Sequence, residues 1–164
     1  MTSALAGADP LPEVLRVADL PLEAIAALLA RHQLRLHKVD DGLPIPGSFW
    51  GDPEAGVIGN DVYARADTPV HSLLHEACHL IVLPPERRAL VHTDATDSDI
   101  EEDATCYLQI VLADDLAGVG RDRLMADMDA WGYSFRLGST KAWFEGDAED
   151  ARAWLVERNL LPAR

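Results

Sequence analysis

The 164-residue sequence is long enough for one domain with a buried core, and its 48% apolar and 26% charged residues are typical of a soluble globular protein. A formal charge of −14 and a pI near 4.6 repel phosphate groups, which argues against a nucleic acid or an anionic membrane as a partner. The apolar runs are short and the N-terminus lacks the basic start of a signal peptide, so we expect a cytoplasmic protein that forms a single domain over residues 1–164.

The first predicted elements are a helix over residues 21–32 and a strand over 33–40, where apolar and polar side chains alternate. Residues 41–56 are rich in glycine and proline and predict a long loop. Within this loop, Phe49 and Trp50 suggest a segment that folds down over either the core or a cleft, and we favour the core.

A hairpin is predicted over residues 57–63, around the turn-forming sequence that begins at Gly59. The next helix is expected to start at Thr68 and Pro69, because a threonine hydroxyl can cap backbone N–H groups and proline fits the first helical turn. Pro84 must end it.

An irregular stretch rich in aspartate and threonine follows over residues 86–98. Further helices are predicted over residues 99–116, 121–131 and 147–159. The two cysteines, Cys78 and Cys106, are too few for a disulfide framework, and we expect reduced, buried side chains.

The sequence "HEACH" within the helix that starts at Thr68 is the strongest chemical signal. His75 and His79 are four residues apart, so on a helix they project from the same face and can bind one metal ion together. Glu76 beside the first histidine is placed to act on a metal-bound water, and neutral imidazole suits zinc. Chance would give roughly 0.01 matches to this pattern in a chain of this composition. His71 lies one turn earlier, where it cannot converge on the same ion, and we expect it to line a cleft or lie at the surface.

A third ligand is needed to distinguish a metal site from an amphipathic helix with incidental histidines. The segment "DIEEDATCYLQIVL" offers Glu101, Glu102 and Asp103 at the start of a predicted helix. A carboxylate there would complete a site of two histidines and one acid with an open fourth position, which is the catalytic zinc pattern.

Two segments of the chain resemble the gluzincin metallopeptidases, and among them the small bacterial peptidases of the ImmA/IrrE-like type. "HEACHLIV" is similar to the H-E-x-x-H motif with its apolar continuation, and "EEDATCYLQIVL" is similar to the family's E-x-E-A-N-x-F-A-x-x-L-L helix. These segments cover about a quarter of the chain. The family's usual DNA-binding helix-turn-helix module has no counterpart here.

The resemblance implies roles for specific residues. His75 and His79 would bind zinc (Zn²⁺), Glu76 would be the general base, and Glu101 would be the third ligand, with Glu102 as the alternative. The alternative stays open because the family's motif asparagine is replaced here, which could shift the register.

The resemblance also implies an α+β, zincin-like fold with a small sheet packed on the motif helix, and a peptide or protein substrate lying along an edge strand near residues 56–64. The expected reaction is peptide-bond hydrolysis by a zinc-activated water, with Tyr133 or His92 as the donor to the oxyanion. A catalytically silent domain that binds a protein partner is the alternative function, and the intact Glu76 argues against it.

Overall fold

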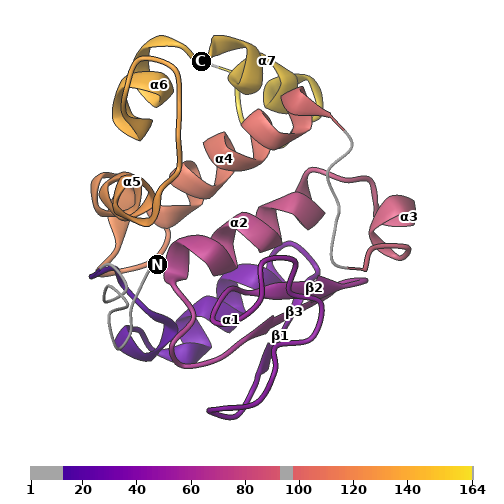
Figure 1. Cartoon of the computed structure of the whole chain (residues 1–164). Coiled ribbons are helices and arrows are strands. Elements are labelled where there is room, and N and C mark those ends of the chain that lie inside the picture. The colour runs from indigo at the N-terminus through magenta and orange to yellow at the C-terminus, as the bar shows by residue number, and fades with distance from the viewer. Residues whose placement is uncertain (1–12, 93–97, 164) are drawn as a thin grey trace.

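The computed structural model describes residues 13–92 and 98–163 and has an α+β architecture. A small sheet and α1 lie on one side of α2, while α4 lies along its other side and α5, α6 and α7 surround α4 (Figure 1). None of the helices in these described ranges has the length and apolar character needed to span a bilayer. The helices are α1 Leu22–Ala30, α2 Val70–Ile81, α3 Pro85–Arg88, α4 Asp99–Ala113, α5 Gly120–Trp131, α6 Thr140–Gly146 and α7 Glu149–Glu157, and the strands are β1 Arg35–Lys38, β2 Gly56–Ile58 and β3 Asp61–Ala64.

The sheet has three strands in the order β1-β3-β2. β3 pairs in parallel with β1 and antiparallel with β2, and the predicted hairpin between β2 and β3 is confirmed. Its turn contains Gly59 with φ +59°, a left-handed conformation that glycine adopts without strain. The sheet is therefore mixed, and its central strand is the one next to the turn that precedes α2.

α2 is buried almost all round, because the sheet covers one side and α4 the other. Every residue of α2 except His75 is buried, and Leu74 and Leu80 have no exposed surface. Burial of one such leucine contributes about 1.5–3 kcal/mol to folding. Polar side chains on this helix must find their partners inside the protein, because a buried polar group without a partner is costly.

The N-terminus of α2 is not capped as expected, whereas the helix ends at Ile81, before Pro84, as predicted. Thr68 does not cap the helix; its hydroxyl accepts a hydrogen bond from the Arg65 N–H at 2.9 Å, so that prediction was wrong. At the other end, the buried guanidinium of Arg88 donates to the carbonyl oxygens of Leu80 at 2.6 Å and Leu83 at 3.1 Å. Arg88 thereby supplies additional donors to carbonyl groups at and just beyond the C-terminus of α2, where intrahelical donors run out.

Of the other predictions about the fold, some were confirmed and some were wrong. Residues 41–55 are irregular, as predicted, but Phe49 and Trp50 are 56% and 71% exposed, so packing over the core was wrong. The helices α3 and α6 were not predicted, because each is too short for a periodic apolar pattern. Cys78 and Cys106 are buried and free, as expected.

Candidate metal site

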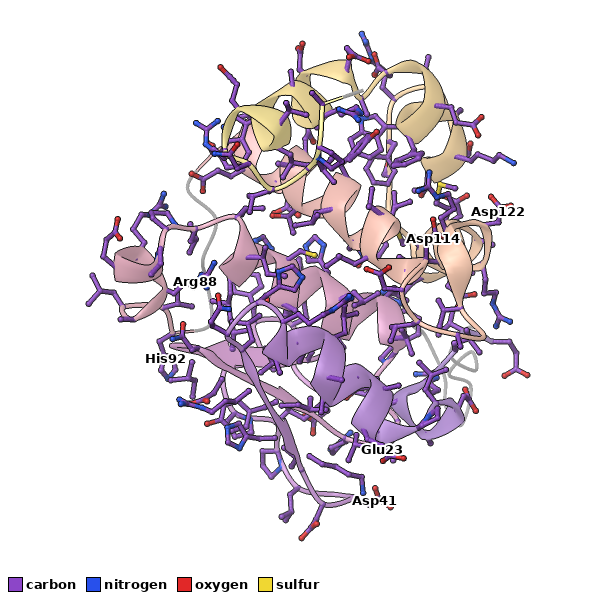
Figure 2. The ribbon with its side chains drawn as sticks, turned by 180° about the vertical axis from the view of Figure 1, so that it is seen from behind. Glu23, Asp41, Arg88, His92, Asp114 and Asp122 are labelled. Carbon is purple, nitrogen blue, oxygen red and sulfur yellow. The ribbon has the colours of Figure 1, made fainter. Side chains whose placement is uncertain are left out.

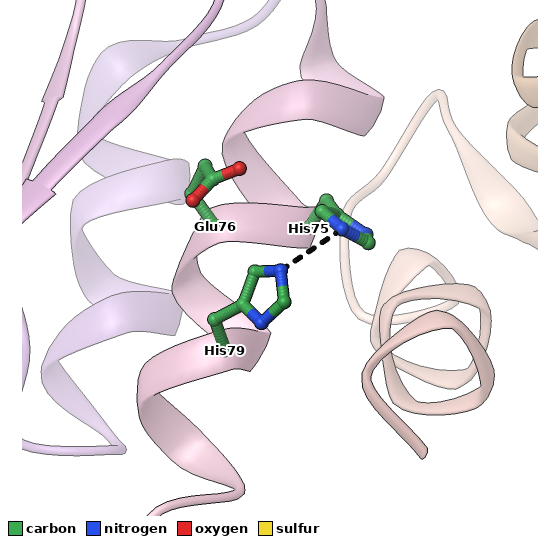
Figure 3. A group of neighbouring side chains, drawn as sticks. All are labelled: His75, Glu76 and His79. Carbon is green, nitrogen blue, oxygen red and sulfur yellow. Dashed lines mark hydrogen bonds between the residues drawn. The ribbon is translucent and has the colours of Figure 1, made fainter. Parts of the chain in front are cut away.

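The imidazoles of His75 and His79 lie one helical turn apart on α2 (Figure 3). Their Nε2 atoms are 3.1 Å apart, and the side chains are 12% and 10% exposed. At this distance, the two nearly buried ring nitrogens are close enough to bind the same metal ion.

The acidic side chain that meets the two histidines is Glu102 of α4. Its Oε1 lies 2.9 Å from His75 Nε2, and its Oε2 lies 3.5 Å from His79 Nε2. The preceding residue, Glu101, points elsewhere, and its Oε2 accepts a hydrogen bond from Arg87 at 3.2 Å. Successive residues on a helix differ in direction by about 100°, so only one of two adjacent glutamates can face α2. The structure therefore brings Glu102, the alternative, to the histidines and directs Glu101, the preferred third ligand, to Arg87.

The distances among these atoms fit a zinc ion. Ligand atoms about 2.0–2.2 Å from a tetrahedral zinc lie roughly 3.3 Å from one another. The two Nε2 atoms are 3.1 Å apart, and the two carboxylate oxygens of Glu102 reach them separately, Oε1 at 2.9 Å from His75 and Oε2 at 3.5 Å from His79. Two imidazoles and one carboxylate form the donor set of a catalytic zinc with an open position. The thiol of Cys106 is also close, since it and donor atoms of His75 and Glu102 lie within 4.8 Å of one another.

Glu76 lies beside the two histidines on α2 (Figure 3). Its side chain is 6% exposed, and one carboxylate oxygen lies within 4.8 Å of a ring nitrogen of each histidine. Glu76 thus lies next to the ring nitrogens of the two candidate ligands on the same helix.

Gln109 of α4 orients His75 and was missed by the sequence reasoning. Its Nε2 donates to the carbonyl oxygen of His71 at 3.1 Å, which leaves Oε1 to accept from Nδ1 of His75 at 2.6 Å. The proton on Nδ1 leaves Nε2 of His75 able to face a metal. One signal was available: Gln109 lies seven positions after Glu102, on the same helix face, within an apolar run.

His71 and Tyr133 form a second supporting contact. Nδ1 of His71 lies 3.2 Å from the Tyr133 hydroxyl, and the His71 ring also contacts Trp131. His71 is 1% exposed, so the expectation that it lines a cleft or lies at the surface was wrong. Burial lowers the pKa of His71 to about 3, so the ring is neutral near pH 7. Burial raises the pKa of the Tyr133 phenol, which keeps the hydroxyl protonated and able to donate.

The two histidines differ in their affinity for a proton. Burial opposes a charge on His75, but Tyr133, Cys106 and Glu102 outweigh that effect and raise its pKa well above the usual value. Burial, and then the charge of His75, lower the pKa of His79 to about 3. Without a metal, His75 therefore carries the positive charge of the pair, and His79 is neutral near pH 7.

His92 does not join this site. It forms an isolated bridge with Ile58 at the edge of β2 and is exposed (Figure 2). The same edge is further covered because Val57 N–H donates to the Gly47 carbonyl at 3.2 Å and Gly59 N–H donates to the Val91 carbonyl at 2.8 Å. The strand edge expected to hold a substrate is thus occupied by the chain itself at these positions.

A cavity of about 400 Å³ opens onto the two glutamates that flank His75. Tyr133 is one of its walls, so of the two proposed oxyanion donors only Tyr133 lies at the site. The lining residues are Trp50, Glu54, Ser72, His75, Glu76, Glu102, Trp131, Gly132 and Tyr133.

Comparison of the chain with models of known families, with characterised proteins and with solved structures returns no match. The likeness to gluzincins therefore rests on the two sequence segments that carry it, and the function is argued from the site.

Proposed function

We propose that this protein is a zinc-dependent metallopeptidase with a zincin-like arrangement, in which His75, His79 and Glu102 bind the metal. The observation that carries the proposal is that Glu102, from a second helix, meets both histidines. Its Oε1 lies 2.9 Å from His75 Nε2 and its Oε2 lies 3.5 Å from His79 Nε2, and the two Nε2 atoms are 3.1 Å apart. The motif alone gives two of the three ligands, whereas the third comes from a residue 23 positions after His79.

Bound zinc supplies Lewis acidity, which polarises a peptide carbonyl and activates water. Glu76 accepts the proton from the attacking water as the new C–O bond forms, and then passes it to the leaving amine as the C–N bond breaks. The Tyr133 hydroxyl, a protonated donor in the cavity wall, donates a hydrogen bond to the oxygen that gains charge. Gln109 keeps His75 in the tautomer that binds metal.

The test measures zinc content and peptide cleavage on the same preparations of three proteins: the wild type, Glu76→Gln and His75→Ala. We expect about one zinc per chain in the wild type and in Glu76→Gln, because the amide keeps the shape of the side chain and the ligands are unchanged. Cleavage should fall by about 10²–10⁴ in Glu76→Gln, and His75→Ala should lose both zinc and cleavage.

Two results would refute the proposal in different ways. Loss of zinc from Glu76→Gln, or cleavage at the wild-type rate, would refute the role of Glu76 as general base. A wild type that binds zinc but cleaves no peptide in a broad library would instead identify a silent, zinc-stabilised binding domain.

A further inference from the structure

We infer that Glu54 makes the cavity selective for a substrate that carries a positive charge, either a lysine or arginine side chain or a free N-terminal amine. The inference rests on the proposed function, because it assigns the substrate class of the same site. Glu54 belongs to none of the sequence motifs, and the loop over residues 41–56 places it in the cavity beside the metal ligands.

Both oxygens of Glu54 are held by neutral donors. Oε1 accepts from the Ser72 hydroxyl at 2.9 Å, and Oε2 accepts from the Trp131 indole N–H at 3.1 Å. These two hydrogen bonds fix the direction of the carboxylate. Ser72 lies on α2 and Trp131 ends α5, so the carboxylate is anchored to the same helices that shape the site.

Within the described residues, neither the hydrogen-bond partners of Glu54 nor a lysine or arginine in the cavity lining supplies a positive charge to Glu54. Its hydrogen-bond partners Ser72 and Trp131 are uncharged, and no lysine or arginine is among the described residues that line the cavity. Glu76 and Glu102, the other two acids of the lining, belong to the metal centre, where a divalent ion would offset their charge. Arg16 lies over the Trp131 ring, 5.2 Å from its centroid, but it is not part of the lining. A cationic group of the substrate is therefore the natural partner of Glu54.

The walls of the cavity suit the same kind of ligand. Trp50, Trp131 and Tyr133 contribute aromatic rings to the lining, and Trp50 remains 71% exposed. Aromatic faces attract ammonium and guanidinium groups and also cover the apolar stem of a lysine or arginine. Trp50, which the sequence suggested was core, thus has a role at the cavity.

The loop that carries Glu54 is held in place before any substrate binds. Arg65, a buried residue, donates to the Leu43 carbonyl at 2.8 Å and to Asp52 Oδ2 at 2.9 Å, which fixes the loop at two points. The Ala55 N–H donates to the Ser72 hydroxyl at 2.9 Å, directly after Glu54. A carboxylate fixed in this way loses little freedom on binding, which favours selectivity.

The experiment uses three alanine-rich heptapeptides that form two matched pairs, with the acetylated citrulline peptide common to both pairs and the arginine peptide acetylated as well. In the first pair the central residue is arginine or citrulline, which has the same shape without the charge. In the second pair the central residue is citrulline and the N-terminus is free or acetylated. Binding is measured on zinc-loaded Glu76→Gln protein, so that it does not depend on turnover, and cleavage is measured on the wild type.

We expect the charged member of one pair to bind at least about tenfold more tightly than its neutral partner, as for a hydrogen bond to a charged group. The pair that shows the effect tells whether a side chain or the amino terminus is recognised. Adding Glu54→Gln should reduce the preference to within about twofold. The matched control is Glu23→Gln, which changes the net charge equally but lies exposed on α1 (Figure 2) and should keep the preference.

Equal affinities within each pair, or a preference that survives Glu54→Gln, would overturn the inference. If Glu54 only anchored the loop, Glu54→Gln would lower the melting temperature and weaken the binding of all three peptides alike. Cleavage by the wild type without charge preference would leave the proposed peptidase standing and refute this inference. Charge-selective binding without cleavage of any peptide would support the role of Glu54 and refute the proposed peptidase.

Discussion

Replacing Glu102 by Gln should weaken zinc binding strongly, whereas the same change at Glu101 should not. The structure separates these adjacent residues clearly. The Glu102 carboxylate lies 2.9 and 3.5 Å from the ring nitrogens of His75 and His79, while Glu101 pairs with Arg87 at 3.2 Å. An amide at position 102 keeps the shape of the side chain but removes the negative charge that a divalent ion attracts.

The expected magnitudes follow from the two environments. Losing a residue that only supports a metal ligand typically costs 10–100-fold in affinity, so losing the ligand itself should cost about 100-fold or more. The Glu101–Arg87 pair is partly exposed, with side chains 13% and 37% accessible, and solvent screening limits its contribution to about 1 kcal/mol or less. We therefore expect Glu101→Gln to bind zinc within about threefold of the wild type.

The assay is a competition titration of zinc against a chromophoric chelator, with the fold of each variant checked by circular dichroism. Both variants lose one negative charge from neighbouring positions, so each serves as the control for the other. If Glu101→Gln lost the metal and Glu102→Gln kept it, the geometric argument would be wrong and the register implied by the family resemblance would be right.

Three further predictions concern the surroundings of the ligands. Gln109→Leu should weaken zinc binding by about 10–100-fold and cost about 1–3 kcal/mol of unfolding free energy, since it leaves the buried Nδ1–H of His75 unpaired and removes the side-chain hydrogen bond to the His71 carbonyl. Unchanged zinc affinity would show that the hydrogen bond does not orient the ring. The raised pKa of His75 means that its ring carries a second proton in the metal-free site, and zinc must displace that proton. Zinc affinity should therefore rise by about tenfold per pH unit below this pKa and level off above it. A zinc affinity that stayed constant between about pH 6 and pH 8 in the same competition titration would contradict this. Trp50→Ala should change the unfolding free energy in urea by less than about 0.5 kcal/mol, because the side chain is 71% exposed, whereas a core tryptophan would cost about 3–5 kcal/mol.

Local patterns in the sequence were enough for the elements that carry the histidines. The spacing of His75 and His79 requires only a helix, and the apolar residues around them predict one. The hairpin before it follows from turn chemistry around Gly59, and the helix that carries Glu102 follows from its length and periodicity. These features depend on residues close together in the chain, which is why the sequence alone could predict them.

The capping of α2 and the position of Trp50 could not be predicted in the same way. Thr68 had the right side chain for a cap, but its hydroxyl bonds to Arg65 instead, and Arg88 fixes the far end of the helix. Phe49 and Trp50 are apolar and would gain from burial, yet the loop is anchored so that they stay exposed. Local propensity was outweighed in both cases by contacts between distant segments.

The sequence determined some of the residues of the candidate site, and the tertiary structure determined the others. The sequence by itself determined that His75, Glu76 and His79 share one helix and that an acid follows at a suitable distance. Only the tertiary structure decided that the acid beside the histidines is Glu102, since a choice between neighbouring residues depends on how α4 is rotated against α2. It also brought Gln109, from α4, against His75, because packing two helices face to face sets distances that no spacing along the chain encodes.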